Sequence, residues 1–309
     1  MDLDVVGSSP ITRPKFFRAG KRIAMTAKMP KAIRPAAPRV RLPAKTVATG
    51  AAPGTPQTKP IHPDLRVFGL SEFAIGDTRF RVVTEDFHKH KTTADEVVVL
   101  KDLRWFEYYG ELIRDRDVRN LVELGIFEGG STLLFALLFD WLNIVAIDWR
   151  QSDQAVLDHV KRLGLEDRIS LCYGVSQDDR DAVEKAIAAK FGGAPVDMVV
   201  DDASHAYRLT RASFEILFPH LRHRGVYLVE DWAWAHWAGG FQTEQWIDEP
   251  ALSNLAFEWT MLLGSRHDIL EKVDIRSGTI AAFKSAVQPL PDFRLSDAYL
   301  MRGKPLPLI

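Results

Sequence analysis

The chain has 309 residues, of which 46% are hydrophobic and 26% charged, and its formal net charge is −1. This composition is typical of a globular protein with one large domain or two modest ones. The single cysteine, Cys172, excludes an internal disulfide framework and a cysteine zinc cluster. No stretch approaches ~20 consecutive apolar residues, so we expect no membrane span.

The first 60 residues differ in charge from the rest of the chain. They hold 12 Lys and Arg against 2 Asp, and 9 of the 17 prolines, whereas the remainder carries a net charge of −11. A proline-rich segment with little hydrophobic periodicity cannot bury enough surface to order itself, so we expect residues 1–60 to be a disordered basic tail. There are three alternatives for this segment. It could contact nucleic acid, it could be a transit-type peptide, or the start could be assigned too early, with Met25 or Met29 as the true start.

Residues 61–115 are predicted to form an entry segment followed by a helix. Short alternating apolar runs over residues 68–83 indicate a small hairpin. Thr93 and Glu96 have the spacing of a capping box, which predicts a helix from Thr93 to about Arg114. Five residues at three- and four-residue spacing form its expected packing face: Leu100, Leu103, Phe106, Tyr109 and Ile113.

Residues 116–309 alternate between strand-like and helix-like segments. Short valine-rich runs bounded by turn signals indicate buried parallel strands. We therefore predict a Rossmann-like, doubly wound α/β domain with a mostly parallel seven-stranded sheet. Near the end, residues 267–275 and 279–284 predict an antiparallel hairpin that closes the sheet.

The segment from Glu123 to Ser131 joins the first strand of this domain to a helix, and it contains Gly125, Gly129 and Gly130. Glycines let the backbone turn tightly and approach a ligand closely, and the helix start offers free N–H groups. A dinucleotide-binding loop would have glycine where Glu123 stands, and this acid disfavours a diphosphate. A cationic ligand that has an amino group and lacks phosphate tolerates the acid, and S-adenosylmethionine fits this description.

Further candidate ligand-binding residues lie at the ends of the next two strands. Asp148 lies 23 residues after Gly125, a spacing that suits a carboxylate binding ribose hydroxyls. Ser176 and Gln177 follow the third strand, where an adenine ring could rest. Capping of the next helix is an equally good explanation for these two residues.

Two valine-rich strands each end in a pair of acids, Asp201-Asp202 and Glu230-Asp231. The segment between them predicts a crossover helix, so both pairs emerge at the carboxyl edge of one sheet, where open α/β sheets bind ligands. Four crowded carboxylates repel one another, and a hard cation such as Mg²⁺ relieves the repulsion. His205 can overhang the same site as a base. Helix capping and solvated loop positions are the alternatives for the acids.

The pattern resembles class I S-adenosylmethionine-dependent methyltransferases. Within them it resembles the metal-dependent group that includes macrolide-sugar and rhamnosyl O-methyltransferases and the cephalosporin hydroxylase proteins. The motifs that carry the resemblance are Glu123-Leu-Gly, Gly129-Gly-Ser, Asp202-Ala-Ser-His, Ser213-Phe-Glu-Ile-Leu-Phe-Pro-His-Leu and Tyr227-Leu-Val-Glu-Asp. The resemblance implies three Mg²⁺ ligands, Asp202, Glu230 and Asp231, with His205 as the catalytic base.

The resemblance also adds Asp201 to the candidate cofactor site. Asp201 directly precedes Asp202, which matches a metal ligand of the family, and it could support that ligand or face the cofactor amino group. The chain departs from the family at Ala203, where glycine is common, and at Arg224-Gly225, where Gly-Gly is common. A left-handed backbone at Ala203 would be unfavourable. The residues predicted to bind S-adenosylmethionine are Glu123, Gly125, Gly129, Ser131, Asp148, Ser176, Gln177 and Asp201.

These features together predict an S-adenosylmethionine-dependent, Mg²⁺-assisted O-methyltransferase that acts on a hydroxyl of a sugar or natural-product small molecule, such as a glycoside or polyketide. Five aromatic residues could line the acceptor site, with ordinary packing as the alternative: Trp105, Tyr108, Trp232, Trp234 and Trp237.

Two other functions stay open on the sequence alone: a cephalosporin-hydroxylase-like enzyme of other chemistry on the same fold, and a nucleotide-binding protein without methyltransferase activity. Nucleic-acid binding through the tail ranks below these, because the rest of the chain is acidic. We expect a cytoplasmic protein without membrane partners. Self-association into a homo-oligomer is left open.

Overall fold

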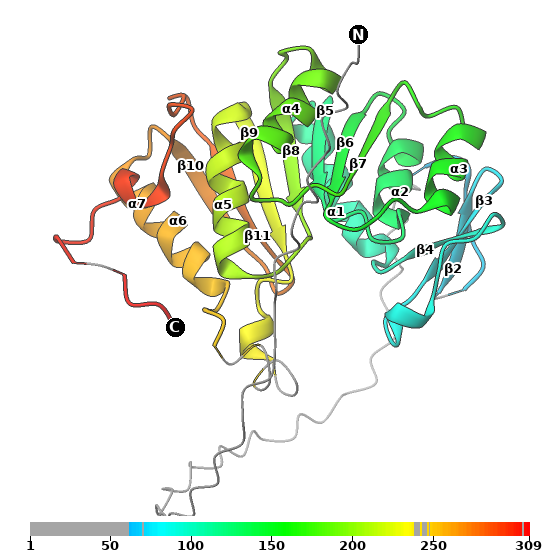
Figure 1. Ribbon diagram of the computed structural model, residues 1–309, viewed down its shortest axis with the longest axis horizontal. Coiled ribbons are helices and arrows are strands. Elements are labelled where there is room, and N and C mark those ends of the chain that lie inside the picture. The colour runs from blue at the N-terminus through cyan, green and yellow to red at the C-terminus, as the bar shows by residue number, and fades with distance from the viewer. Residues whose placement is uncertain (1–61, 70, 238–241, 243–245, 247, 305) are drawn as a thin grey trace, which may run out of the picture. The chain divides into compact units, whose positions relative to one another are not determined.

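The computed structural model describes residues 62–69, 71–237, 242, 246, 248–304 and 306–309 (Figure 1). Residues 1–56 and 57–309 separate into two units, and every described residue belongs to the second. The predicted basic tail therefore lies outside the described residues and stays a prediction.

A seven-stranded sheet forms the centre of the described unit. Its strand order is β10-β11-β9-β8-β5-β6-β7, in which β9, β8, β5, β6 and β7 run parallel and β11 is antiparallel to both of its neighbours. This confirms the predicted doubly wound, mostly parallel sheet with a C-terminal antiparallel hairpin. The strands are β5 Asn120–Leu124, β6 Asn143–Asp148, β7 Ile169–Tyr173, β8 Val196–Asp201, β9 Leu221–Glu230, β10 Leu270–Ile275 and β11 Thr279–Lys284.

Helices cover both faces of this sheet (Figure 1). Successive strand residues point to opposite faces, so neighbours such as Val199 and Val200 contribute to two separate cores. One core packs against α1 Leu103–Asp115, α2 Gly130–Leu138 and α3 Gln154–Arg162, and the other against α4 Arg180–Phe191, α5 Tyr207–Leu217, α6 Ser253–Ser265 and α7 Leu295–Ala298. Within the described ranges, no helix combines the length and apolar content needed to cross a bilayer.

A second, four-stranded sheet precedes this layered region. Its order is β1-β2-β3-β4, with β3 and β4 parallel and the other pairs antiparallel. The hairpin predicted over residues 68–83 corresponds to β2 and β3. The elements are β1 Leu65–Val67, β2 Glu72–Ile75, β3 Thr78–Val82, a 3₁₀ turn at Phe87–Lys89 and β4 Glu96–Val99.

The prediction of a helix beginning at Thr93 is wrong. The Thr93 N–H donates to the Glu96 carbonyl at 2.9 Å, which closes a turn, and residues 96–99 continue as β4. Three β-branched residues, Val97 to Val99, are all buried there, and such residues favour a strand over a helix. The helix begins instead at Leu103, where the Asp102 carboxylate accepts the Arg104 N–H at 3.0 Å.

Candidate active site

The carboxyl ends of β5, β8 and β9 meet at the point where the strand order reverses. The chain passes from β5 outward through β6 and β7, then returns to β8 on the other side of β5. Such switch points are where open α/β sheets bind ligands. At this point Gly125 adopts φ 96°, and a Cβ there would lie 2.2 Å from the Asp202 carbonyl oxygen. Glycine is therefore required for the turn and for the close approach of the two chain segments.

Three of the predicted site residues converge at this edge. Asp202, His205 and Asp231 each offer one ligand atom, and these atoms lie within 4.8 Å of one another. His205 Nε2 is 3.8 Å from Asp202 Oδ1. Two carboxylates and an imidazole at this spacing could bind a divalent cation together. Alternatively, the imidazole could act as a base beside the two acids.

Both His205 and Asp231 have φ 54°, a left-handed conformation that costs free energy for residues with a side chain. Ala203 is not left-handed, so the departure from glycine at that position introduces no strain. Arg224, in contrast, has φ 66° at the position where the resembled family commonly has glycine. The two strained residues at the sheet edge are those that bring their side chains to Asp202.

A buried lysine also reaches this edge. Lys101 Nζ lies 2.6 Å from Asp202 Oδ2 and 3.2 Å from Glu230 Oε1, and the residue is 6% exposed. The Tyr109 hydroxyl donates to the same Glu230 oxygen. We call Lys101, Tyr109, Asp202 and Glu230 the Lys101 cluster. Burial, and then the charge of Asp202, raise the pKa of the Glu230 carboxyl well above its usual range.

The Lys101 cluster changes the expected arrangement of the metal site. Glu230, predicted as a ligand, has its Oε1 in contact with Lys101 and Tyr109, while Asp202 and Asp231 group with His205. Sequence analysis missed Lys101 and assigned Tyr109 to packing alone. One signal was present: Lys101 directly follows the run Val97-Val-Val-Leu, and a lysine at the end of a buried strand needs a partner if it is buried too.

Asp201 lies in a separate polar cluster. Its Oδ2 accepts hydrogen bonds from Ser213 Oγ and Tyr227 Oη, each at 2.7 Å, and Gln177 Nε2 donates to Oδ1 at 3.3 Å. We call these four residues the Asp201 cluster. Burial raises the pKa of Asp201 to about 6, against the opposing effect of the two hydroxyl donors. The structure thus places Asp201 and Gln177 among protein partners, and Gln177 Oε1 also accepts the Ser204 N–H at 3.2 Å.

The predicted cofactor residues at the glycine loop are buried. Glu123 is 0% exposed; its Oε2 accepts a hydrogen bond from the Thr132 hydroxyl, and its Oε1 has no hydrogen-bond partner among the described residues. Burial raises the pKa of the Glu123 carboxyl. Ser131, in the first turn of α2, is also buried. A Cβ at Gly129 would lie 2.5 Å from Val156 Cγ1, so this glycine permits close packing of the loop against α3.

Asp148 binds the glycine loop itself. Its Oδ2 accepts the N–H groups of Ile126 and Phe127 at 3.0 Å each, and its Oδ1 accepts the Arg150 N–H at 2.8 Å. Near these residues, Arg150 Nη1 and Tyr173 Oη are buried without hydrogen-bond partners in the part of the chain that the structure describes. Neither was identified from the sequence. Ser176, by contrast, is exposed and donates to Asp178.

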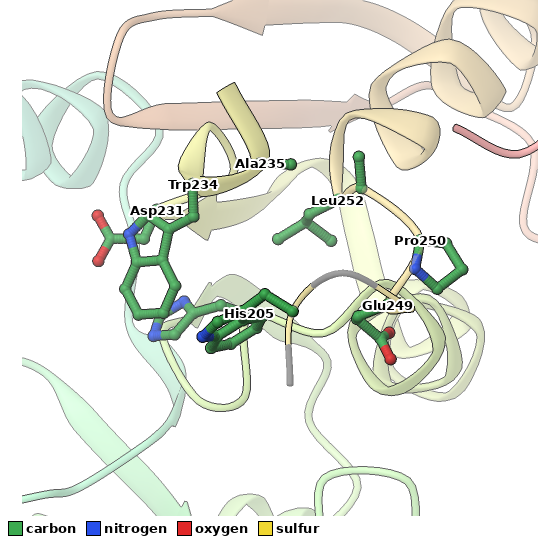
Figure 2. A pocket seen from close by; sticks show the side chains of 9 residues that line it. His205, Asp231, Trp234, Ala235, Glu249, Pro250 and Leu252 are labelled. Carbon is green, nitrogen blue, oxygen red and sulfur yellow. The ribbon is translucent and has the colours of Figure 1, made fainter. Parts of the chain in front are cut away.

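An aromatic pocket adjoins His205 and Asp231 (Figure 2). The Trp234 ring lies over His205, with ring centroids 4.1 Å apart, and Leu252 and Pro250 line the opposite wall. Of the three tryptophans predicted to line the acceptor site, only Trp234 lines this pocket. Trp232 Nε1 donates to the Arg276 carbonyl at 2.8 Å, and Trp237 is 44% exposed.

A second hollow lies between the start of α1 and the β10–β11 turn. Trp105 and Tyr108, the other two predicted entrance residues, line it together with Arg276 and Gly278. The Arg276 guanidinium stacks 3.9 Å from the Tyr108 ring centroid. The carbonyl of Gly278, which lines this hollow, accepts the Asp231 N–H at 2.9 Å. The hollow therefore adjoins the backbone of the acidic edge.

Comparison with known proteins shows what part of the chain is similar to. Residues 122–232 match the family described as a methyltransferase domain. The chain is 32% identical over 148 residues to demethylmacrocin O-methyltransferase of Streptomyces fradiae, a match covering 44% of this chain and 34% of that protein. It is 33% identical over 148 residues to mycinamicin VI 2''-O-methyltransferase of Micromonospora griseorubida, with the same coverage of 44% and 34%. The match thus spans about a third of the length of these curated relatives.

Among solved structures, MycE methyltransferase from the mycinamycin pathway, in complex with Mg and SAH, is 26% identical. The alignment covers 59% of this chain and 50% of that chain, with a TM-score of 0.45. The sequence matches confirm the methyltransferase resemblance that the motifs predicted.

Proposed function

We propose, from the methyltransferase domain at residues 122–232, that this protein transfers a methyl group from S-adenosylmethionine to a hydroxyl of a sugar or related natural-product acceptor, assisted by Mg²⁺. One observation carries the proposal: Asp202, His205 and Asp231 converge within 4.8 Å beside the glycine loop, at the switch point of the sheet. The edge thus combines acids for a cation, a base for a hydroxyl proton and a loop for a cofactor.

The glycine loop fits S-adenosylmethionine. Glu123 Oε1 is a buried carboxylate oxygen without a hydrogen-bond partner among the described residues, which suits the ligand's amino group. The unpartnered Arg150 Nη1 and Tyr173 Oη offer donors near Asp148, where the nucleoside would lie. Ser131 and Ser176 remain candidate contacts. Asp201 and Gln177 would act by fixing the segment that carries Ser204 and His205.

The acidic edge fits a hard divalent ion, because Asp202 and Asp231 supply carboxylate oxygens and Glu230 lies directly beside them. When bound, Mg²⁺ would lower the pKa of an acceptor hydroxyl and orient it. Asp202 and Asp231 would hold the ion, with Glu230 as the third predicted ligand. Three carboxylates and no second histidine among these residues disfavour the two-histidine, one-carboxylate site of iron oxygenases.

His205 would act as the general base. When bound, S-adenosylmethionine would supply the methyl group to the acceptor hydroxyl oxygen and keep the electron pair of the broken bond on its sulfur, and the hydroxyl would lose its proton. The hydroxyl proton passes to His205, whose Nε2 faces Asp202 at 3.8 Å. Asp202 thereby stabilises the imidazolium that forms. The Trp234 ring packs against the His205 ring, with centroids 4.1 Å apart, and this contact restricts the orientation of the imidazole.

The acceptor class rests on the relatives and on Trp234. The two named relatives are O-methyltransferases of demethylmacrocin and mycinamicin VI, and a third is named for a rhamnosyl-tetracenomycin acceptor. The Trp234 ring beside His205 offers an aromatic face against which a sugar ring can pack. A cytoplasmic location and self-association stay predictions from the sequence.

Calorimetric titration with S-adenosylmethionine and, separately, with Mg²⁺ tests the proposal. We expect the wild-type protein to bind both, and Asp202→Ala to lose the metal while keeping the cofactor. Asp158→Ala, which changes an exposed acid on α3, is the matched control and should bind both. Folded protein that binds no S-adenosylmethionine would refute the proposal, whereas cofactor binding without metal binding would remove the role assigned to the acidic edge.

A further inference from the structure

Lys101 is a buried cation at an edge that carries several acids. Its ammonium contacts Asp202 Oδ2 at 2.6 Å and Glu230 Oε1 at 3.2 Å, and only 8% of its side chain is exposed. Glu123 lies close enough to interact electrostatically with Lys101 as well. Asp231 completes four carboxyl groups around one lysine, so Lys101 supplies the fixed positive charge that opposes their repulsion.

The two oxygens that Lys101 contacts belong to two of the three predicted metal ligands. A divalent ion shared by Asp202, Glu230 and Asp231 would bind two carboxylates that the ammonium already contacts through one oxygen each. The two carboxylate oxygens of Asp202 have different neighbours: Oδ2 contacts Lys101, and Oδ1 faces His205. An ion near this group would also approach a like charge, which disfavours its binding.

The fold holds Lys101 in this place. It follows β4, whose backbone packs so closely on α2 that a Cβ at Gly130 would lie 2.3 Å from the Val98 carbonyl oxygen. The Lys101 side chain thus enters the edge from the four-stranded sheet, while Asp202 and Glu230 come from the seven-stranded sheet. Because these elements are packed, the ammonium has little freedom to swing away when another cation arrives.

We propose that Lys101 is a positioning residue that acts as a built-in counter-cation: it holds Asp202 and Glu230 together and competes with the divalent ion for them. This inference rests on the proposed metal-assisted function. It implies that the protein binds Mg²⁺ weakly, with Asp202 and Asp231 as the main ligands. It also implies that the carboxylates stay in place when the metal is absent.

An ordinary ion pair elsewhere in the same region provides a control. Lys91 Nζ contacts the buried Glu128 Oε1 at 2.6 Å, but 54% of its side chain is exposed, and none of the described contacts of Lys91 is to the acidic edge. Lys91→Met removes a cation of the same type from a buried carboxylate and should leave metal affinity unchanged.

The test measures Mn²⁺ binding by electron paramagnetic resonance and Mg²⁺ binding by calorimetry on wild type, Lys101→Met, Lys101→Arg and Lys91→Met. We expect Lys101→Met to bind either ion at least about tenfold more tightly than wild type, and Lys101→Arg, which keeps the charge, to stay within about threefold of it. Lys101→Met should also melt at a lower temperature than wild type in chelator and regain the difference when Mg²⁺ is added.

Unchanged or weaker metal binding by Lys101→Met, or no metal binding by either protein, would overturn the inference. If wild type binds S-adenosylmethionine and methylates an acceptor while Lys101→Met shows no gain in metal affinity, the inference fails and the proposed function stands. If Lys101→Met fails to fold without metal, the Mg²⁺ concentration needed to restore folding decides: restoration at or below the wild-type dissociation constant supports the inference, and restoration only above it contradicts it.

Discussion

Asp201 and Asp202 are neighbours in the chain, yet their carboxylates lie in two different clusters on opposite faces of the sheet. Asp201 accepts hydrogen bonds from neutral donors, Ser213 and Tyr227, within the core beneath α5. Asp202 contacts the Lys101 ammonium and lies 3.8 Å from His205. One step along the chain thus separates a carboxylate held by hydroxyl groups from one that lies beside a lysine and a histidine.

The two clusters are built alike in one respect. Each contains a fully buried tyrosine whose hydroxyl donates to a buried acid, Tyr227 to Asp201 and Tyr109 to Glu230. They differ in charge, because the Lys101 cluster contains a cation and the Asp201 cluster contains none. Matched substitutions in the two clusters can therefore separate structural from functional effects.

The largest expected effect comes from Asp202→Asn. Removing this charge takes away a metal ligand and the partner of His205, so we expect the methyl-transfer rate to fall by about 10²- to 10⁴-fold. The release of S-adenosylhomocysteine, measured with a glycoside acceptor found by screening, checks this. Asp201→Asn is the control and should lower the rate by less than about tenfold. Equal losses in the two variants would show that the clusters do not divide structure from chemistry.

Gly125→Ala should destabilise the chain segment that carries Asp202. The added Cβ would lie 2.2 Å from the Asp202 carbonyl oxygen at a backbone φ of 96°. We expect a loss of about 3 kcal/mol or more in the free energy of unfolding, measured by chemical denaturation. Gly164→Ala has a similar left-handed backbone, φ 63°, with no atom within 4 Å of the added Cβ, and should cost about 1 kcal/mol. Similar losses for both would mean that the close contact is relieved at no cost.

The Asp201 cluster should give a pH-dependent contribution to stability. Burial raises the pKa of Asp201 to about 6 from 3.8 for the free side chain. Ionisation therefore costs more in the folded state, and the contribution is complete below pH 3.8 and lost as pH rises through about 6. In Asp201→Asn this loss is absent, so between pH 4 and 7 the free energy of unfolding of the variant should rise by about 2 kcal/mol relative to that of wild type. The free energy of unfolding of each protein is measured by chemical denaturation across this range. A difference between wild type and variant that does not change with pH would contradict the raised pKa of Asp201.

The smallest effects should come from the two tyrosines. Tyr109→Phe and Tyr227→Phe each remove one hydrogen bond to a buried acid, and each should lower the free energy of unfolding by about 1.5 kcal/mol. Only Tyr109→Phe should also change Mg²⁺ affinity, since Tyr109 contacts Glu230. Calorimetry on both variants checks this difference, and a change in metal affinity with Tyr227→Phe would join the two clusters into one site.

Much of the fold was determined by local sequence patterns. The valine-rich strands, the glycine loop and the two acid pairs at strand ends were enough to predict a doubly wound sheet and to place Asp202, His205 and Asp231 at one edge. These features rely on periodicity and on the rule that parallel strands end at the same edge, and both can be read from the chain alone.

Three features were decided only by the tertiary structure. The run at Val97–Val99 became a strand because a neighbouring strand and α2 were available to bury it, against the capping signal at Thr93. Lys101 entered the acidic edge from a separate sheet, 101 residues from Asp202 in the chain, a pairing that no local pattern encodes. The partners of Asp201 likewise come from α5 and β9. The partners in long-range contacts depend on packing and charge. Both are determined only when the sheets and helices have come together.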